Sequence, residues 1–260
     1  MSEFYPICTE KSLAVVFNMD FKDSKTDHRK GSEQDIISLR MTFETNLKFE
    51  FHLHENFTVL KIKDELENLS KREFDDEACL VIVLMTHGSN DGLVSAVDEN
   101  FDKSLLWENF TDERCPSLAG KPRLIFLQTC RGNIHNNGCE LGSNSNDPPS
   151  SCANNDSDSN EFKFKLEKNN FAQLPIDFFV GYATIEGFFS LRVWTGSFFV
   201  QSLCIVINEN PGLIIDLIMA KVNERVANER ILVNPTENIY LRVCQQPIFR
   251  SNLTKMLKFK

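Results

Sequence analysis

Two short, nearly continuous apolar segments place the strongest constraint on how this chain folds. Residues 79–85 read CLVIVLM and residues 123–128 read RLIFLQ, and polar or glycine-containing sequence follows each of them at once. Strands that are apolar at almost every position are typical of parallel sheets, because helices cover both faces of such sheets. The two segments therefore predict central strands of an α/β fold, with functional groups on the loops beyond their carboxyl ends.

The rest of the chain alternates between strand and helix patterns, as a mostly parallel sheet with helices on both faces requires. Ser32 and Asp35 fit a capping box that opens a helix over residues 33–46. Thr58 opens a second helix, whose apolar residues recur at helical spacing. The other expected elements are a buried strand at 12–18, a strand with one solvated face at 48–54, a strand at 176–183, helices at 196–207 and 212–230, and closing strand material from 247 onward.

Residues 133–160 interrupt this pattern. Eight Asn and six Ser make up half of this segment, and it contains no Lys or Arg. Such a composition cannot bury enough apolar surface to offset the entropy of ordering the chain. We expect a disordered linker that proteases can reach.

Charge and cysteine usage narrow the class of protein. Lys and Arg number 28 against 37 Asp and Glu, a net charge of −9, so neither nucleic acid nor an anionic membrane is an expected partner. The N-terminal residues resemble neither a signal peptide nor a spanning helix. The eight Cys contain no C-x-x-C pair, which favours free thiols. We expect a soluble, cytoplasmic protein that needs no cofactor.

A histidine and a cysteine follow the two central strands. His87 precedes Gly88, and Cys130 precedes Arg131 and Gly132. Neighbouring strand ends would bring the imidazole and the thiol together, which is the minimum apparatus for acyl transfer to cysteine. The N–H groups of Gly88 and Cys130 could then form an oxyanion hole. The alternative is that both are structural, since Cys is common in protein cores.

Residues 128–132 (QTCRG) resemble the caspase signature Q-A-C-[RQG]-G, in which the histidine lies about 50 residues upstream. Further stretches resemble other motifs of that family in the same order: residues 86–88 (THG), 117–122 (SLAGKP), 181–184 (GYAT), 190–192 (SLR) and 196–204 (GSFFVQSLC). The resemblance covers nearly the whole chain from residue 12 onward. It implies a caspase-like three-layer sandwich.

The resemblance also implies a cysteine endopeptidase that cleaves after aspartate, with His87 as general base and acid and Cys130 as nucleophile. Arg29, Gln128 and Arg192 then match the family's first-subsite residues, and two guanidiniums with an amide suit a carboxylate. The group that orients His87 would be a backbone carbonyl near Asp27. The neighbouring subsites match Phe189, Ser190 and Leu191.

Two departures from the family pattern affect this site. Thr129 stands where alanine is usual, and Leu191 replaces a tryptophan. The first could alter rate, and the second could alter preference at the subsites upstream of the cut.

By the same resemblance, the chain divides into a minimal pro-region (1–11), a large-subunit part (12–132), the linker (133–160) and a small-subunit part (161–260). Asp156 and Asp158 are the candidate processing sites in the linker. A short pro-region implies an effector-like zymogen acting in programmed cell death, cut by an upstream initiator caspase. The family further implies a homodimer of large and small subunit pairs, protein substrates with Asp at the cleavage site, and inhibitor-of-apoptosis proteins as partners.

Two other functions fit parts of the pattern. A catalytically impaired, caspase-like regulator or decoy would keep the fold, and Thr129 and Leu191 leave that alternative open. A related cysteine peptidase with basic or Asn preference would not explain the paired arginines.

His52 and His54 have the i, i+2 spacing of metal ligands. They lie on the expected solvated face of the 48–54 strand, where such a pair is ordinary, so we expect no metal site.

Overall fold

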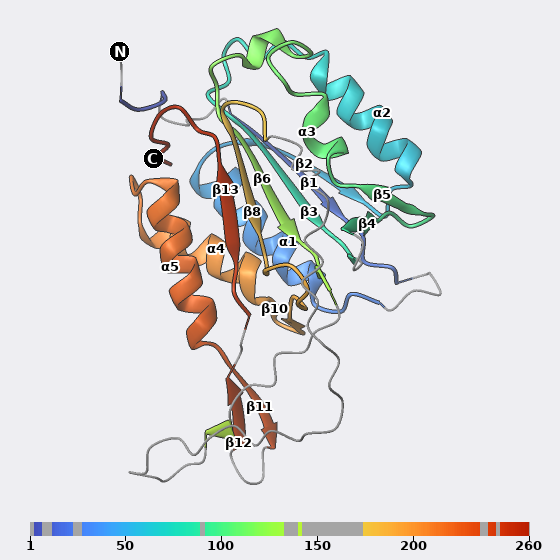
Figure 1. Ribbon diagram of the computed structural model, residues 1–260, viewed down its shortest axis with the longest axis vertical. Coiled ribbons are helices and arrows are strands. Elements are labelled where there is room, and N and C mark those ends of the chain that lie inside the picture. The colour runs from blue at the N-terminus through green and yellow to red at the C-terminus, as the bar shows by residue number, and fades with distance from the viewer. Residues whose placement is uncertain are drawn as a thin grey trace, which may run out of the picture.

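A six-stranded sheet forms the centre of the molecule (Figure 1). The structure, a computed structural model, describes residues 3–6, 12–22, 28–88, 92–132, 140–141, 174–234, 239–242 and 245–259. The strand order is β13-β8-β6-β3-β1-β2. All neighbouring strands are parallel except β13, which runs antiparallel to β8. The strands are β1 (Leu13–Asn18), β2 (Glu50–Glu55), β3 (Leu80–Met85), β6 (Arg123–Gln128), β8 (Phe178–Tyr182) and β13 (Ile248–Ser251).

Helices cover both faces of this sheet and enclose two apolar cores. On one face lie α1 (Ser32–Arg40), which continues as a π-helical turn (Met41–Asn46), α4 (Phe198–Glu209) and α5 (Ile215–Asn228). On the other face lie α2 (Val59–Ser70) and the short α3 (Leu105–Glu108) (Figure 1). Alternate residues of the central strands enter opposite cores, as the pleat of a strand dictates. The expected α/β sandwich is confirmed.

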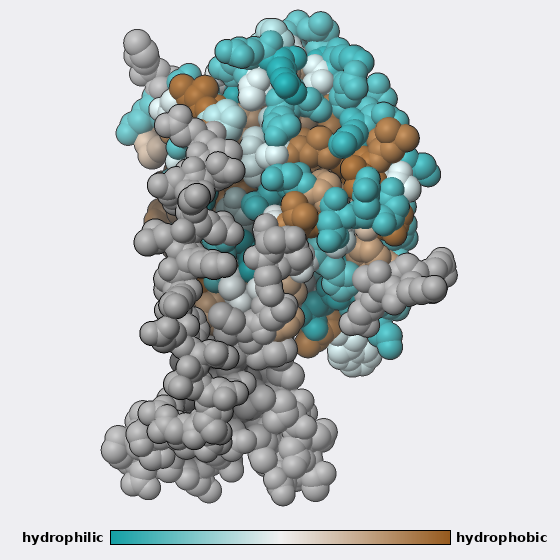
Figure 2. Space-filling view, turned by 45° about the vertical axis from the view of Figure 1, so that its right-hand side comes forward, coloured by the Kyte–Doolittle hydropathy of each residue, from teal (hydrophilic) through white to brown (hydrophobic). Residues whose placement is uncertain are grey.

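The surface is consistent with most apolar side chains lying in the two cores. Figure 2 shows a face that is largely hydrophilic, with hydrophobic residues in small groups. No helix in the part of the chain that the structure describes is long and apolar enough to cross a membrane.

The helix starts were predicted with mixed success. Thr58 caps α2 as expected, since its Oγ1 accepts a hydrogen bond from the N–H of Lys61 at 3.3 Å. The capping box at Ser32 was wrong: Gly31 is the N-cap, and no side chain caps α1. The Asp35 carboxylate instead accepts bonds from the N–H of Ser197, at 2.9 and 3.1 Å, at the start of α4. The Asp35 carboxylate therefore forms a tertiary contact with α4, whereas the local sequence pattern predicted a bond within its own helix.

The solvated face expected for β2 is also only half correct. Residues 51–54 of this strand are all partly buried, because Phe51 and Leu53 pack against one core and His54 on the opposite face contacts Glu65 of α2. His54 is the most covered of its polar side chains, with 16% of the side chain exposed.

Several small elements had no clear sequence signal. They are the hairpin of β4 (Leu93–Ser95) and β5 (Asn100–Asp102), a 3-10 turn (Pro116–Leu118), the hairpin of β9 (Arg192–Val193) and β10 (Gly196–Ser197), and a sheet of β11 (Arg230–Asn234), β12 (Ile239–Arg242) and β7 (Glu140–Leu141). β7 lies inside the segment expected to be disordered. The rest of residues 133–160 is outside the described residues.

Candidate active site

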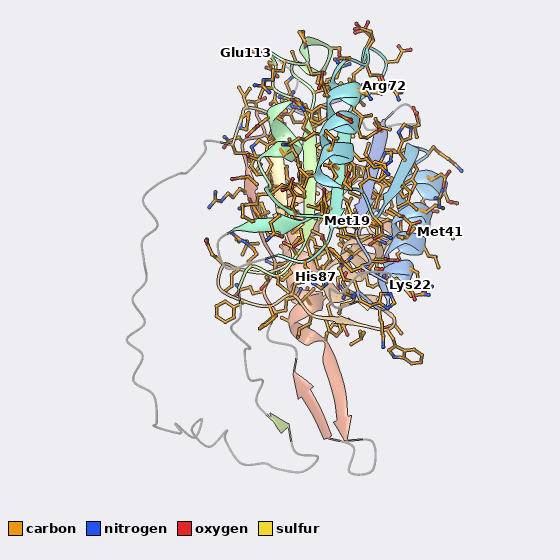
Figure 3. All side chains as sticks on the ribbon, turned by 90° about the vertical axis from the view of Figure 1, so that its right-hand side faces the viewer. Met19, Lys22, Met41, Arg72, His87 and Glu113 are labelled. Carbon is orange, nitrogen blue, oxygen red and sulfur yellow. The ribbon has the colours of Figure 1, made fainter. Side chains whose placement is uncertain are left out.

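The carboxyl ends of β1, β3 and β6 meet at one edge of the sheet. Asn18 is in register with Met85, and Met85 is in register with Gln128. The N–H of Thr86 donates to the carbonyl of Gln128 at 3.2 Å, so the two chains stay together beyond the strands. Figure 3 shows His87 at the same end of the sheet as Met19 and Lys22. The register therefore brings the loops that begin at Thr86 and at Thr129 side by side, as the sequence predicted.

Gly88 lies directly against the backbone of Cys130. A Cβ atom on Gly88 would come within 2.0 Å of the Cys130 carbonyl oxygen, so no larger residue fits without moving one of the two loops. The His87 ring packs on Phe21, with 4.9 Å between the ring centroids. Both His87 and Cys130 are partly exposed. The imidazole loop and the thiol loop are thus in contact and accessible.

The Cys130 thiol contacts the loop that follows β8. Its Sγ lies 3.4 Å from the amide nitrogen of Ser190, which donates to it, and 3.7 Å from the Ser190 carbonyl oxygen. The described cysteines Cys79, Cys115 and Cys204 are all buried. Burial raises the pKa of Cys204 to about 12, which keeps that thiol unreactive. Among the described cysteines, Cys130 is the one that is not buried.

Arg29 is fully buried beneath this edge of the sheet. Its Nη1 donates to Asn18 Oδ1 at 3.1 Å, to the Met19 carbonyl at 3.2 Å and to the Met85 carbonyl at 3.0 Å. Its Nε and Nη2 are buried without a hydrogen-bond partner. Burial, followed by repulsion from Arg192, lowers the pKa of Arg29 to about 9. The guanidinium therefore keeps two donor nitrogens for which the described residues provide no acceptor.

Gln128 and Arg192 complete the group that the sequence assigned to the first subsite. Gln128 is buried, and its Nε2 donates to Ser190 Oγ at 2.7 Å, while its Oε1 has no partner. The Nε of Arg192 donates to the Lys30 carbonyl at 2.9 Å. Gly31, at φ +85°, allows this approach, because a Cβ there would lie 2.3 Å from the Val193 carbonyl oxygen. The structure brings all three predicted side chains to the same edge of the sheet as Cys130.

Sequence reasoning missed two polar residues that hold this site. Asn18 ends β1 and accepts from Arg29, and a polar residue at the end of a buried strand was the only available signal. Gln245 is buried and spans the loop after β8: its Oε1 accepts from the Leu191 N–H at 2.6 Å, and its Nε2 donates to the Ala183 carbonyl at 2.8 Å. No local pattern identifies Gln245, because both of its partners are more than fifty residues away.

The remaining predicted residues have different outcomes. Phe189 and Leu191 are partly buried on the loop beside Ser190, and Leu191 packs against the core beneath it. Trp194, on the adjoining turn, is 82% exposed. Asp27, Asp156 and Asp158 lie outside the described residues.

Comparison with known proteins agrees with this geometry. A family model described as caspase domain matches residues 11–258. The chain is 33% identical to Caspase-1 of Drosophila melanogaster, over 99% of this chain and 76% of that protein. It is 30% identical to Caspase-3 of Bos taurus, over 96% of this chain and 85% of the relative.

A solved structure gives the same result. The crystal structure of Caspase-1 from Spodoptera frugiperda matches with a TM-score of 0.75 and 25% identity, over 99% of this chain and 93% of that one. The family model, the relatives and the shared fold agree with a thiol and an imidazole meeting above a buried arginine. On these grounds the chain belongs to the caspase family of cysteine peptidases.

Proposed function

We propose that this protein is a cysteine endopeptidase that cleaves proteins after aspartate. The observation that carries the proposal is the pair of buried donor nitrogens on Arg29, Nε and Nη2, which have no partner among the described residues. Unpaired buried donors are costly, and a short side chain with a carboxylate would satisfy both. Arg29 donates to the Met85 carbonyl, two residues before His87, so such a carboxylate would bind close to the loops that carry the imidazole and the nucleophile. A neutral side chain would leave the guanidinium uncompensated.

In this proposal His87 removes the proton of the Cys130 thiol as the sulfur attacks the scissile carbonyl. The oxyanion accepts hydrogen bonds from the N–H groups of Gly88 and Cys130, each worth roughly 10²–10³ in rate. The protonated imidazole then gives its proton to the leaving amine, and a thioester remains. Water, deprotonated by His87, hydrolyses the thioester and restores the thiol.

Substrate entry requires a local movement of the loop after β8. Solvent does not reach Arg29, and Gln128 is 2% exposed, because Gln128 is bonded to Ser190 and Ser190 also contacts the Cys130 sulfur. When Ser190 shifts, the amide of Gln128 and the guanidinium of Arg29 become available together. Phe189 and Leu191 flank this point and would contact the residues upstream of the cut.

We further propose an effector-like role in programmed cell death, in the cytoplasm, as a zymogen activated by an upstream caspase. Asp156 and Asp158 each precede Ser in a segment rich in Asn and Ser. Segments of this composition are readily cleaved by proteases. Activation would leave a large part and a small part, and the active form would be a homodimer of such pairs. Incubating the precursor with an initiator caspase should give fragments that separate at residue 156 or 158. A first cut elsewhere would contradict this scheme.

Activity is tested with two matched peptides that carry either Asp or Asn at the cleavage position. The two side chains have the same shape and differ only in charge and in the replacement of one carboxylate oxygen by an amide nitrogen. We expect the linker-cleaved protein to prefer Asp by roughly 10⁴–10⁵ in kcat/KM. Cys130→Ala should abolish turnover while the thermal melting curve is preserved. Equal cleavage of both peptides, or turnover by Cys130→Ala, would refute the proposal.

The second candidate is a regulator that keeps the fold without turnover, and the closed first subsite favours it. Thr129 is also buried beside Gly88, with its Cβ 3.2 Å from where a Gly88 Cβ would lie. An irreversible inhibitor with an Asp side chain separates the two functions. Stoichiometric labelling of Cys130 supports the enzyme, and no labelling of the cleaved protein supports the regulator.

A further inference from the structure

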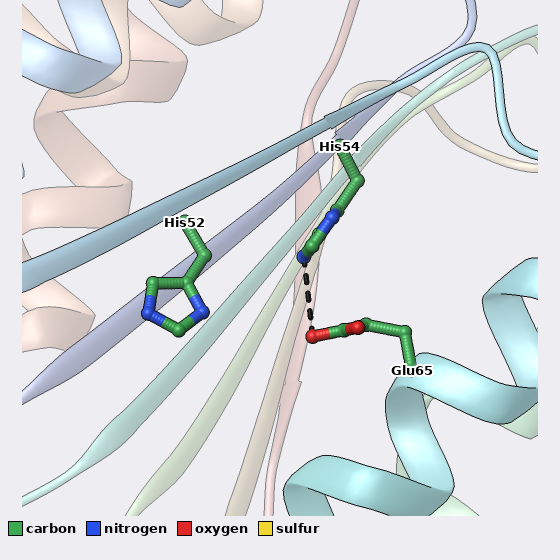
Figure 4. Close-up of side chains that lie close together, drawn as sticks. All are labelled: His52, His54 and Glu65. Carbon is green, nitrogen blue, oxygen red and sulfur yellow. Dashed lines mark ion pairs between the residues drawn. The ribbon is translucent and has the colours of Figure 1, made fainter.

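A second group of chemically active side chains lies on the sheet edge farthest from β13. His52 and His54 come from β2, and Glu65 comes from the facing helix α2 (Figure 4). The i, i+2 spacing places both rings on one side of the strand. One ligand atom from each of the three residues lies within 4.8 Å of the others. Two imidazoles and a carboxylate therefore converge between the edge strand and the helix that covers it.

The pair of His54 and Glu65 already has the spacing of two ligands on one metal ion. His54 Nε2 lies 3.3 Å from Glu65 Oε1. Zinc binds imidazole nitrogen and carboxylate oxygen at about 2.0–2.2 Å, so two of its tetrahedral ligands are about 3.3 Å apart. His54 Nε2 is buried and pairs with Glu65 as an ion pair when the ring is protonated (dashed line in Figure 4), and it forms no hydrogen bond with the described residues. A cation between the two groups would satisfy both.

The fold fixes the orientation of the His54 ring. The ring stacks on Phe17, with centroids 5.1 Å apart and an interplanar angle of 27°, and packs on Phe57 at 4.8 Å. A ring held in this way loses little conformational entropy when it binds a metal.

His52 is held by a carboxylate in the manner typical of metal-bound histidines. Its Nε2 lies 2.7 Å from Glu50 Oε1, and Glu50 forms two bonds with Arg72, at 3.1 and 2.6 Å. When Nε2 donates to Glu50, the lone pair is on the other ring nitrogen, which points towards His54 and Glu65 in Figure 4. The His52 side chain is 33% exposed, so its ring has room to move the remaining distance.

We infer that His52, His54 and Glu65 form a binding site for a divalent transition-metal ion, best represented by Zn²⁺, that ties the edge strand β2 to α2. Two imidazole nitrogens favour a borderline ion such as Zn²⁺ over Mg²⁺ or Ca²⁺, which prefer oxygen ligands. Water would occupy the fourth position, since the His52 side is open to solvent. Glu50 supports the site as the hydrogen-bond partner of a ligand.

The test uses the full chain with Cys130→Ala, because a thiol beside an imidazole is a pair of zinc-binding groups that would compete for the added metal. After treatment with a chelator, Zn²⁺ binding is measured by equilibrium dialysis, and thermal melting is recorded with and without the metal. Glu65→Gln and His52→Ala should each weaken one Zn²⁺ by at least about tenfold, and Glu50→Gln by about 10- to 100-fold. Glu55→Gln is the matched control, because Glu55 is an exposed carboxylate on the opposite side of the same strand.

Zn²⁺ should raise the melting temperature of the parent and of Glu55→Gln, but not that of Glu65→Gln. Zn²⁺ bound to thiols elsewhere in the chain would be present in all variants. The difference in Zn²⁺ binding between Glu65→Gln and Glu55→Gln therefore reports on the proposed site alone. Substitution with Co²⁺ gives a second readout: the site should show tetrahedral visible absorption without thiolate charge-transfer bands. Equal Zn²⁺ affinity in Glu65→Gln and Glu55→Gln, or Mg²⁺ displacing Zn²⁺ at equal concentration, would overturn the inference.

Discussion

Replacing Arg29 by Met should remove activity at little cost in stability, whereas the same change at Arg123 should do the reverse. Both arginines are almost fully buried. Arg123 is well paired: Nη2 binds Asp112 Oδ1 and the Ile176 carbonyl, each at 2.8 Å, and Nη1 binds the Leu118 and Lys121 carbonyls. Arg29 bonds through Nη1 alone.

The magnitude follows from the pKa of Arg29. Its pKa falls from the ordinary arginine value to about 9, so burial and the repulsion from Arg192 together disfavour the charged form by about 5 kcal/mol, at about 1.36 kcal/mol for each pKa unit. Met relieves that cost but loses three charge-assisted hydrogen bonds, at about 1.5 kcal/mol each. The two effects nearly cancel, so the free energy of unfolding should stay within about 2 kcal/mol of the parent. Arg123→Met leaves a carboxylate and several carbonyls unpaired, and should lose about 3–5 kcal/mol.

Urea unfolding and peptide kinetics together test this reasoning. Arg29→Met should lose about 2–5 kcal/mol of transition-state binding for an Asp peptide, or about 30- to 5,000-fold in kcat/KM. The folded fraction of Arg123→Met should keep kcat/KM within about threefold of the parent. If Arg29→Met unfolds as readily as Arg123→Met, or if it still cleaves the Asp peptide at the parental rate, the account of Arg29 as an uncompensated anion receptor is wrong.

Three further outcomes are expected. Gly88→Ala should lower kcat/KM, and it should lower the free energy of unfolding by about 1–3 kcal/mol, because the added Cβ would lie 2.0 Å from the Cys130 carbonyl oxygen. Parental values in both assays would contradict this close contact. Iodoacetamide at pH 8 should modify Cys130 well before Cys204, whose pKa burial raises to about 12, and mass spectrometry showing Cys204 labelled first would refute this order. Arg72 lowers the pKa of Glu50 to about 2, so this carboxylate stabilises the fold above its ordinary pKa of 4.5, and the benefit is lost as the pH falls towards 2. Glu50 is largely exposed, so its contribution to the free energy of unfolding should stay below about 1 kcal/mol. Glu50→Gln should flatten the pH dependence of the urea midpoint between pH 2 and 5. Identical curves for the variant and the parent would argue against a stabilising Glu50–Arg72 ion pair.

The strands and the main helices could be predicted because their signals are local. The runs at 79–85 and 123–128 are buried on both faces, and this burial is what makes them continuously apolar. The neighbouring strand ends then follow from parallel pairing, which places the loops of His87 and Cys130 together.

The remaining features depend on contacts between distant segments. Arg29 lies in a polar loop without periodicity, so only its resemblance to a family motif singled it out. Asp35 bonds to the start of α4 rather than to its own helix, and Gln245 bridges two residues of the segment that follows β8. Glu65 is one of several carboxylates on α2, and only the three-dimensional packing distinguishes it as the neighbour of His54.

The pairing of β6 with β8 determines what a break between residues 141 and 174 would do. Five residues of one strand, from Arg123 to Leu127, align with Phe178–Tyr182 of the other, in the middle of the sheet. Arg29 and Arg192 come from opposite sides of that break, yet Arg192 holds the Lys30 carbonyl. A nicked chain should therefore elute from a gel-filtration column as one particle under native conditions and give two bands only on a denaturing gel. In the native particle, Arg29 of one polypeptide and Arg192 of the other would still lie at the same site.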